Sequence, residues 1–188
     1  MEMLTKTELY VRRREIVDKI QKGTLFIYPT DTIYGLGCNA EDDHAVAKIR
    51  KIKRLSATPL SVIVPSVDWI RDNCVITKKT EMWLQKLPGP FTLILQLKNK
   101  HAVAENVAPK SKTIGIRFID HWFMETIQKC GVPLITTSAN KRGEPFMTSV
   151  DDLNKDIERN IEFMIYEGKK KGRPSKIVDV ETEKVIER

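Results

Sequence analysis

Residues 25–37 constrain the fold more tightly than any other stretch of the chain. Four apolar residues, 25–28, are typical of a short buried strand, and they run into a proline, a cluster of hydroxyl side chains and one carboxylate. Gly35 and Gly37 follow, and glycine lets backbone approach backbone or a ligand closely. The stretch therefore indicates either a ligand site at the end of a strand or a tight turn in which Thr30 and Asp31 cap backbone groups.

Size and composition favour a single domain spanning residues 1–188. The chain is 41% hydrophobic and 30% charged, and its length fits one domain or one domain with a small appendage. No window approaches the roughly 20 apolar residues of a membrane span. The N-terminus also lacks the basic and apolar regions of a signal peptide. We therefore expect a cytoplasmic protein with no membrane partner.

The cysteines and the net charge bear on possible partners. Cys38, Cys74 and Cys130 are far apart, so we expect small buried hydrophobes in a reducing compartment and not a metal or redox site. The three histidines are also scattered, and their spacing predicts no metal cage in the protein. The net charge of +7 favours nucleic acid or a nucleoside triphosphate as partner, or reflects only a solvated basic surface.

The apolar patterns predict an α/β domain with a twisted mixed sheet, because strands and helices mix without strict alternation. A first helix would begin in a capping box of Thr5 and Glu8. A second would be capped by Asp42 or Asp43, and the continuous apolar strand at 59–64 would be buried on both faces. The other strands are predicted at 24–28, 91–97, 113–118, 132–135, 161–166 and 176–180, and the helices at 5–21, around Trp69, and at 81–87, 120–130 and 150–158.

Three further features permit two interpretations each. The helix after Asp43 has a basic end of five residues, Lys48, Arg50, Lys51, Lys53 and Arg54. These suit the helix dipole when solvated, or alternatively Lys53 and Arg54 overhang the loop at 29–37 and hold phosphate. Composition alone favours the solvated helix end. The second hydroxyl-rich strand end, at 136–140, satisfies a turn or offers hydrogen bonds to a ligand. Arg117, in the strand at 113–118, is either paired on the surface or aimed into a pocket.

Several stretches in this order resemble the YrdC-like family of threonylcarbamoyl-AMP synthases. The resemblance runs from about residue 10 to residue 180, and so many motifs in register are unlikely to agree by chance. The stretches are 29–37, Lys53-Arg54 before Pro59-Leu60, 88–92, 115–117, 137–140, and Pro174-Ser175 before 177–179.

The resemblance implies a YrdC-like fold with a large, basic concave face and a nucleotidyltransferase activity. Such an enzyme condenses L-threonine, bicarbonate or carbon dioxide, and ATP into threonylcarbamoyl-AMP and pyrophosphate. Other proteins would use this product to modify adenosine 37 of tRNA, and tRNA or structured RNA is a possible direct partner. The leaving pyrophosphate needs cations, and Mg²⁺ is expected to arrive with ATP instead of in a dedicated protein site.

The resemblance also implies roles for individual residues. Those expected on the threonine side are Thr30, Thr32, Tyr34, Thr137 and Arg117, the last pairing the carboxylate of the amino acid. Those expected to be catalytic through the ATP phosphates are Lys53 and Arg54. Those expected to fix the nucleotide and the carbamate are Thr113, Thr137, Ser138, Asn140 and Ser175.

Two departures from the family pattern leave alternatives open. Lys53 and Arg54 are adjacent, whereas the family has one residue between them, so Lys51 is an alternative phosphate ligand; Lys176, which follows Ser175, is another. Three functions are therefore weighed: the synthase, an RNA-binding module of the same fold without synthase activity, and a paralogue with another nucleotide-dependent activity. The glycine-rich basic loop at 168–173 is a candidate for closing the site.

Overall fold

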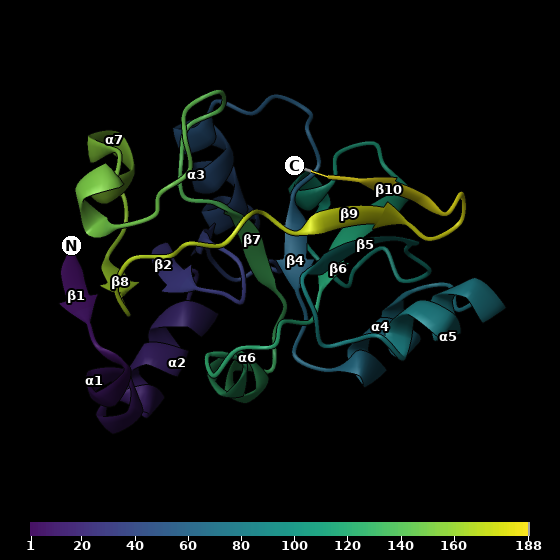
Figure 1. The fold of residues 1–188 in the computed structure, drawn as a ribbon, viewed down its shortest axis with the longest axis horizontal. Helices are drawn as coiled ribbons and strands as arrows, with labels where there is room; N and C mark the ends of the chain where they lie inside the picture. The colour runs from purple at the N-terminus through teal and green to yellow at the C-terminus, as the bar shows by residue number, and fades with distance from the viewer. Residues whose placement is uncertain (188) are drawn as a thin grey trace.

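The computed structural model describes residues 1–187, which contain ten strands and seven α-helices (Figure 1). The strands are β1 (Glu2–Leu4), β2 (Phe26–Pro29), β3 (Tyr34–Gly37), β4 (Ser61–Ile63), β5 (Phe91–Gln96), β6 (Thr113–Arg117), β7 (Leu134–Ser138), β8 (Phe163–Ile165), β9 (Lys176–Asp179) and β10 (Lys184–Ile186). The helices are α1 (Lys6–Val11), α2 (Arg13–Gln21), α3 (Asp43–Lys53), α4 (Val67–Asn73), α5 (Lys78–Leu84), α6 (Met124–Cys130) and α7 (Lys155–Glu158), with 3₁₀ turns at Glu105–Val107 and Val150–Asp152.

All ten strands belong to one mixed sheet in the order β1-β8-β2-β3-β7-β4-β6-β5-β9-β10. β2 and β3 are antiparallel and joined by the hydroxyl-rich loop, whereas β4 and β6 are parallel. This confirms the predicted α/β class and the mixed sheet. Because β3, β7, β4 and β6 are consecutive neighbours, the order brings the first hydroxyl-rich loop, the second hydroxyl-rich strand end and Arg117 to the centre of the sheet.

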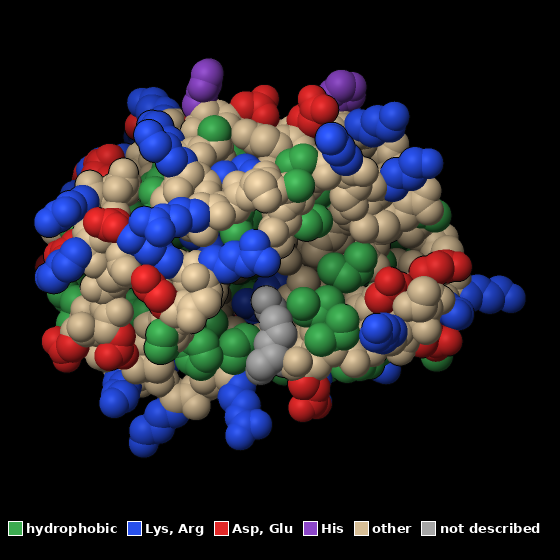
Figure 2. Space-filling view, turned by 90° about the horizontal axis from the view of Figure 1, so that it is seen from above, with side chains coloured by type: hydrophobic (Ala, Val, Ile, Leu, Met, Phe, Trp, Pro, Cys, Tyr) green, Lys and Arg blue, Asp and Glu red, His purple; other side chains and the backbone are tan. Residues whose placement is uncertain are grey.

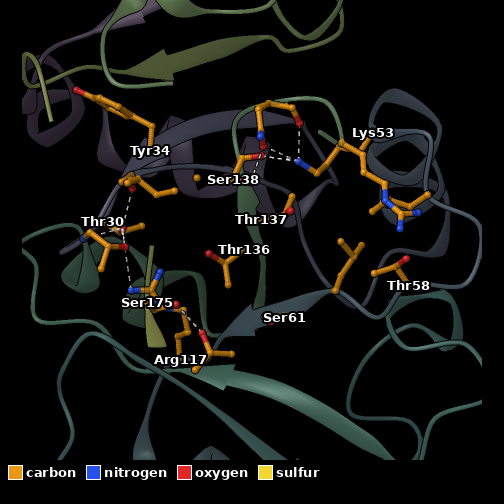
Figure 3. A pocket seen from close by; sticks show the side chains of 18 of the residues that line it. Thr30, Tyr34, Lys53, Thr58, Ser61, Arg117, Thr136, Thr137, Ser138 and Ser175 are labelled. Carbon is orange, nitrogen blue, oxygen red and sulfur yellow. Dashed lines mark hydrogen bonds between the residues drawn. The ribbon is translucent and has the colours of Figure 1, made fainter. Parts of the chain in front are cut away.

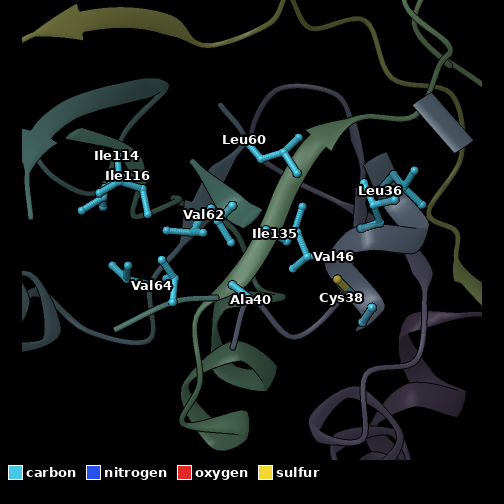
Figure 4. Close-up of a cluster of buried hydrophobic side chains, with 14 of the residues drawn as sticks. Leu36, Cys38, Ala40, Val46, Leu60, Val62, Val64, Ile114, Ile116 and Ile135 are labelled. Atoms are coloured by element: carbon cyan, nitrogen blue, oxygen red, sulfur yellow. The ribbon is translucent and has the colours of Figure 1, made fainter. Parts of the chain in front are cut away.

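Two hydrophobic clusters cover the two faces of the sheet. One contains Val46 and Ile49 of α3 together with Val62 of β4 (Figure 4). The other contains Ile16 and other residues of α1, α2 and α6 together with Ile63 of β4. Neighbouring residues of β4 therefore point into opposite clusters, which confirms that this strand is buried on both faces.

Tyr28 explains why glycine is needed in β3. Its buried ring lies across that strand, and its hydroxyl donates to the carbonyl of Ile135 at 2.9 Å. A Cβ at Gly37 would lie 2.5 Å from the same carbonyl oxygen and 2.6 Å from the ring of Tyr28. The close approach that the sequence predicted is thus made here by a packed tyrosine.

The predicted helix at 5–21 is wrong in one respect, since it is divided at Arg12 into α1 and α2. Its capping box between Thr5 and Glu8 is confirmed. Arginines interrupt the apolar stripe between Leu9 and Ile16, and the break lets both of these residues pack in one cluster. Asp42 is the residue that caps α3, which settles the predicted choice between it and Asp43.

The other differences concern element boundaries and the two short edge strands β1 and β10, which were not predicted. The helix predicted at 81–87 begins three residues earlier, at Lys78, because Thr77 forms its N-cap. The helix predicted at 150–158 is a 3₁₀ turn followed by the short α7. All three cysteines are unpaired and buried, as predicted. Within residues 1–187 no helix is long and apolar enough to cross a membrane.

Candidate active site

A cavity of about 560 Å³ lies where β3, β4, β6 and β7 meet (Figure 3). Most of the residues singled out from the sequence line it, although they are spread over the whole chain. These are Thr30, Thr32, Tyr34, Lys53, Arg117, Thr137, Ser138, Asn140 and Ser175. The sheet order therefore gathers both hydroxyl-rich stretches and Arg117 around one hollow.

Arg54 and Thr113 are not among the residues that line this cavity. Arg54 ends α3 in a left-handed conformation, with φ of 54°, and its side chain is exposed. Thr113 begins β6, at the opposite end of that strand from Arg117, and its hydroxyl lies 3.2 Å from that of Ser111. The structure thus separates these two residues from the others that were expected to hold the nucleotide.

The loop between β2 and β3 is both a turn and a wall of the cavity. Thr30 Oγ1 donates to the carbonyl of Ile33 at 2.7 Å and accepts from the Thr32 amide at 3.1 Å. The two threonine hydroxyls lie 3.0 Å apart. The two interpretations of this stretch are therefore compatible, because the turn holds the hydroxyl groups in a fixed arrangement at the cavity.

Arg117 reaches this loop and forms a buried ion pair with Asp31. Its Nη2 donates to Asp31 Oδ1 at 2.5 Å and to Thr32 Oγ1 at 3.3 Å, and the two charged side chains are only 7% and 9% exposed. Burial raises the pKa of the Asp31 carboxyl, although the nearby Arg117 opposes that shift. Arg117 is thus aimed into the site, and Asp31 fixes its orientation.

Lys53 extends from the end of α3 to the end of β7. Its Nζ donates to the carbonyls of Ser138 and Asn140, each at 2.6 Å, and lies 3.2 Å from Asn140 Oδ1. Lys53 is only 5% exposed, and burial lowers its pKa to about 8. The interpretation of Lys53 as a solvated residue at the helix end is therefore wrong, whereas its contact with phosphate stays a prediction.

Arg50 is a second basic residue of α3 that the solvated interpretation misplaces. It is 8% exposed and donates to the carbonyls of Thr58 at 3.0 Å, Asn106 at 3.1 Å and Ser56. These bonds hold the segment that follows α3 and forms one wall of the cavity. The alternative phosphate ligands do not line the cavity: Lys51 is exposed, and Lys176 pairs with Glu187 at 2.7 Å.

Tyr34 and Ser175 contribute to the site through groups that are already bonded. The Tyr34 hydroxyl donates to the carbonyl of Gly168 at 2.7 Å, and burial raises its pKa to about 12. The Ser175 hydroxyl lies 2.7 Å from that of Thr92 in the buried wall. Both residues therefore shape the cavity through contacts with distant segments.

Sequence reasoning missed several residues that line the cavity, among them Ser61, Thr92 and Arg142. Thr92 closes the stretch 88–92 that carried the family resemblance, and Arg142 follows the second hydroxyl-rich strand end, so both had a positional signal. Ser61 lies inside an apolar strand and had none.

The charge of the cavity has one sign. Lys53, Arg117 and Arg142 line it, and no Asp or Glu does so within the described chain. On the face shown in Figure 2, Lys and Arg side chains lie along one side of a hollow and hydrophobic side chains along the other. Residues 1–187 contain no group of three or more His, Cys, Asp or Glu residues placed to hold a metal ion. Such a cavity suits an anionic ligand with hydrogen-bonding groups.

Comparison with known proteins identifies the family. Residues 18–188 match the sequence model of the Sua5/YciO/YrdC family, whose description is telomere recombination. The chain belongs to this family. A Methanocaldococcus jannaschii member, named provisionally as a threonylcarbamoyl-AMP synthase, is 34% identical over 181 residues, which are 93% of this chain and 84% of that relative. The predicted resemblance is therefore confirmed.

Longer relatives share the same region. The threonylcarbamoyl-AMP synthase of Mus musculus is 32% identical over 142 residues, covering 74% of this chain and 50% of its own length. P. abyssi Sua5, solved in complex with L-threonine, is 28% identical with a TM-score of 0.83 over 95% of this chain and 53% of that protein. This chain thus spans about half the length of these two Sua5/YciO/YrdC relatives.

A shorter neighbour supports the fold alone. E. coli YciO superposes with a TM-score of 0.81 at 21% identity, over 95% of this chain and 88% of that protein. The likeness to Sua5 and YciO confirms the predicted YrdC-like architecture, in which helices flank a twisted mixed sheet.

Proposed function

We propose that this Sua5/YciO/YrdC protein is an L-threonylcarbamoyladenylate synthase, a nucleotidyltransferase that makes threonylcarbamoyl-AMP and pyrophosphate from L-threonine, bicarbonate or carbon dioxide, and ATP. The observation that carries the proposal is the cavity itself, which joins three cationic side chains to two hydroxyl-rich loops. Family members named for this activity, and the P. abyssi protein solved with L-threonine, support it.

In the proposed reaction the amino group of threonine adds to carbon dioxide, which gives a carbamate and releases a proton. A carbamate oxygen then forms a bond to the α-phosphorus of ATP while the bond from that phosphorus to the bridging oxygen of pyrophosphate breaks. No protein nucleophile takes part. The protein must therefore hold two anionic substrates in line and keep water from the carbamate.

The residues suit these tasks in distinct ways. Arg117 would pair the carboxylate of threonine, because Asp31 occupies only its Nη2 and leaves other N–H groups of the guanidinium. Thr137 lies in the same wall with a hydroxyl that is not hydrogen-bonded within the described residues. Lys53 and Arg142 would face the phosphates, and Ser138, Asn140 and Ser175 would frame the nucleotide.

Mg²⁺ belongs to the proposal as a companion of ATP. The cavity wall offers cations and hydroxyls but no carboxylate among the described residues, and Mg²⁺ in nucleotide sites takes oxygen ligands from phosphates and carboxylates. The residues of the chain alone therefore do not make a magnesium site. We assign its ligands to the triphosphate and derive no step of the protein through it.

The wider role follows from the product. Threonylcarbamoyl-AMP would pass to proteins that modify position 37 of tRNA, and we propose a cytoplasmic location for this step. The second candidate is an RNA-binding module without synthase activity, which the number of exposed cations favours. They include Arg54, Arg142, Lys169, Lys171 and Arg173. A paralogue with another nucleotide-dependent activity is the third.

Pyrophosphate release from ATP and Mg²⁺ by the purified protein tests the proposal. L-threonine and bicarbonate are supplied together, and each is then left out in turn. The synthase requires both for release, and mass spectrometry should find threonylcarbamoyl-AMP in equal amount. Release that ignores threonine would point to another nucleotide-dependent activity. Absence of release, together with salt-sensitive RNA binding that ATP does not change, would favour the RNA-binding module.

A further inference from the structure

The connection from β8 to β9 crosses the front of the sheet in Figure 1 and contacts the β2–β3 loop. We call residues 167–173 the strap. The Tyr34 hydroxyl donates to the carbonyl of Gly168 at 2.7 Å, and the Lys170 amide donates to the carbonyl of Thr148 at 2.9 Å. A Cβ at Gly172 would lie 2.1 Å from the carbonyl oxygen of Thr32. The strap is therefore packed directly on the residues that form the wall of the cavity.

Lys170 makes the contact that bears on the site. Its Nζ donates to the carbonyl of Thr30 at 2.8 Å. Thr30 is buried, and its carbonyl belongs to the peptide group that joins it to Asp31. Asp31 in turn holds the guanidinium of Arg117. The ammonium group of Lys170 thus holds the peptide group next to Asp31, which is the partner of Arg117.

Glu167 keeps Lys170 in this position. It forms a close ion pair with Lys170, and it accepts from Trp122 Nε1 at 2.6 Å and lies 3.1 Å from His121 Nε2. His121 and Trp122 follow β6 only a few residues after Arg117. These contacts therefore link the residues after β6 to the strap, the strap to the β2–β3 loop, and that loop to Arg117 at the end of β6.

The neighbouring lysines show that this arrangement belongs to one position. Lys169 and Lys171 are exposed and form no hydrogen bond or ion pair within residues 1–187. Lys170 has only a small exposed fraction of its side chain, 16%. The three lysines carry the same charge, so only geometry distinguishes them.

We propose that Lys170 is a positioning residue for the threonine end of the cavity, acting through the Thr30–Asp31 peptide on Arg117. The proposal rests on the function proposed above for the substrate it names. Loss of the ammonium group leaves a buried carbonyl without its donor and removes one of the contacts that hold the strap on the loop. The orientation of Arg117 then becomes less defined, and binding of the threonine carboxylate weakens while the phosphate side of the cavity is unaffected.

Lys170→Met is the test, with Lys169→Met as the matched control. The KM for L-threonine, the KM for ATP and kcat are measured by pyrophosphate release. We expect Lys170→Met to raise the KM for threonine about tenfold, because the less well oriented guanidinium of Arg117 loses part of its contact with the carboxylate, with the KM for ATP within about twofold. Lys169→Met should match the parent protein, and Lys170→Arg should recover most of the loss.

Amide hydrogen exchange gives a readout that needs no turnover. Lys170→Met should speed exchange in residues 30–36, and Lys169→Met should not. Should Lys170→Met fail to fold, Glu167→Gln weakens the same contact while keeping its shape, and it should change threonine KM and exchange in the same direction. Inactivity of the parent protein would refute the synthase proposal, and the exchange data would still decide the role of Lys170. Equal exchange in both lysine variants, or equal losses for threonine and ATP, would overturn the positioning role.

Discussion

Replacing Arg50 by Met tests whether a buried guanidinium supports the wall of the cavity. Arg50 lies in the last turns of α3 and donates to three backbone carbonyls, two of them in the loop that follows the helix. Methionine has a similar helix propensity and can fill the space of the aliphatic stem. The variant therefore removes the three donors and changes little else.

The expected loss of stability depends on whether water can replace Arg50 as the donor to each carbonyl. A hydrogen bond from a charged group contributes about 1.5–3 kcal/mol, but Ser56 and Thr58 are exposed and water can replace their lost donor. The carbonyl of the half-buried Asn106 has less access to water. We therefore expect the free energy of unfolding to fall by about 3 kcal/mol. For a chain of this length that corresponds to about 6–12 °C in Tm.

Thermal and urea unfolding of Arg50→Met and of Lys51→Met measure the effect. Lys51 is the neighbouring exposed residue of the same helix, so the control makes the same change of residue class without removing a buried donor. Its stability should stay within about 0.5 kcal/mol of the parent protein. Equal stability of the two variants would refute the reasoning, because it would mean that the Arg50 bonds contribute nothing that water does not supply.

Three further predictions concern the cavity and the sheet. Arg117→Lys keeps the charge but loses the guanidinium fork, so the KM for threonine should rise about tenfold, with ATP kinetics as the internal control. Burial lowers the pKa of Lys53 to about 8, so its charge is present below that pH and lost above it. The KM for ATP should therefore rise as pH increases through 8, and Lys53→Arg should flatten that profile. Gly37→Ala places a Cβ 2.5 Å from the carbonyl of Ile135 and should lower the free energy of unfolding in urea by about 2–3 kcal/mol; an unchanged urea midpoint would contradict the close packing.

Local patterns predicted the parts of this fold that local interactions determine. The capping box joins Thr5 and Glu8, which are only three positions apart, and it forms as the sequence indicates. The hydroxyl-rich loop after β2 is bonded within itself, so its composition alone indicated a turn that presents threonine side chains. The strands β1 and β10 lie at the edges of the sheet and are mostly exposed, so they carry no apolar run that would indicate a strand, and they were not predicted.

Pairings across the chain could not be predicted in the same way. Asp31 and Arg117 are 86 residues apart, and Lys53 and Ser138 are 85 apart. They meet because β3 pairs with β7 and β4 pairs with both β7 and β6, and no short stretch of sequence contains that order. The family resemblance indicated nine of the residues that line the cavity, but it gave no indication that Asp31 is the partner of Arg117.

The burial of Arg50 could have been predicted from helical spacing, although composition indicated an exposed residue. Val46, Ile49, Arg50 and Lys53 follow the spacing of one helical face, and Val46 and Ile49 are in the core. The number of basic residues at the end of the helix favoured a solvated end. Their positions around the helix axis, however, place some of them on the buried face and the others on the exposed face. Arg50 and Lys53 continue the buried face, and both are satisfied there by backbone carbonyls.

The residues that line the cavity fall into two groups. Those whose polar groups are hydrogen-bonded within the protein form its frame, and those whose polar groups are not bonded are available to contact a ligand. Thr30, Tyr34 and Ser175 line the cavity, yet their hydroxyl groups are bonded within the protein. Thr137 and Arg142 line it with side chains that make no hydrogen bond within residues 1–187. A frame fixed before binding reduces the ordering cost when substrates enter. Changes in the frame should therefore weaken ground-state and transition-state binding together and raise KM, whereas changes at Arg142 should reduce kcat to the extent that it meets charge developing on the leaving pyrophosphate.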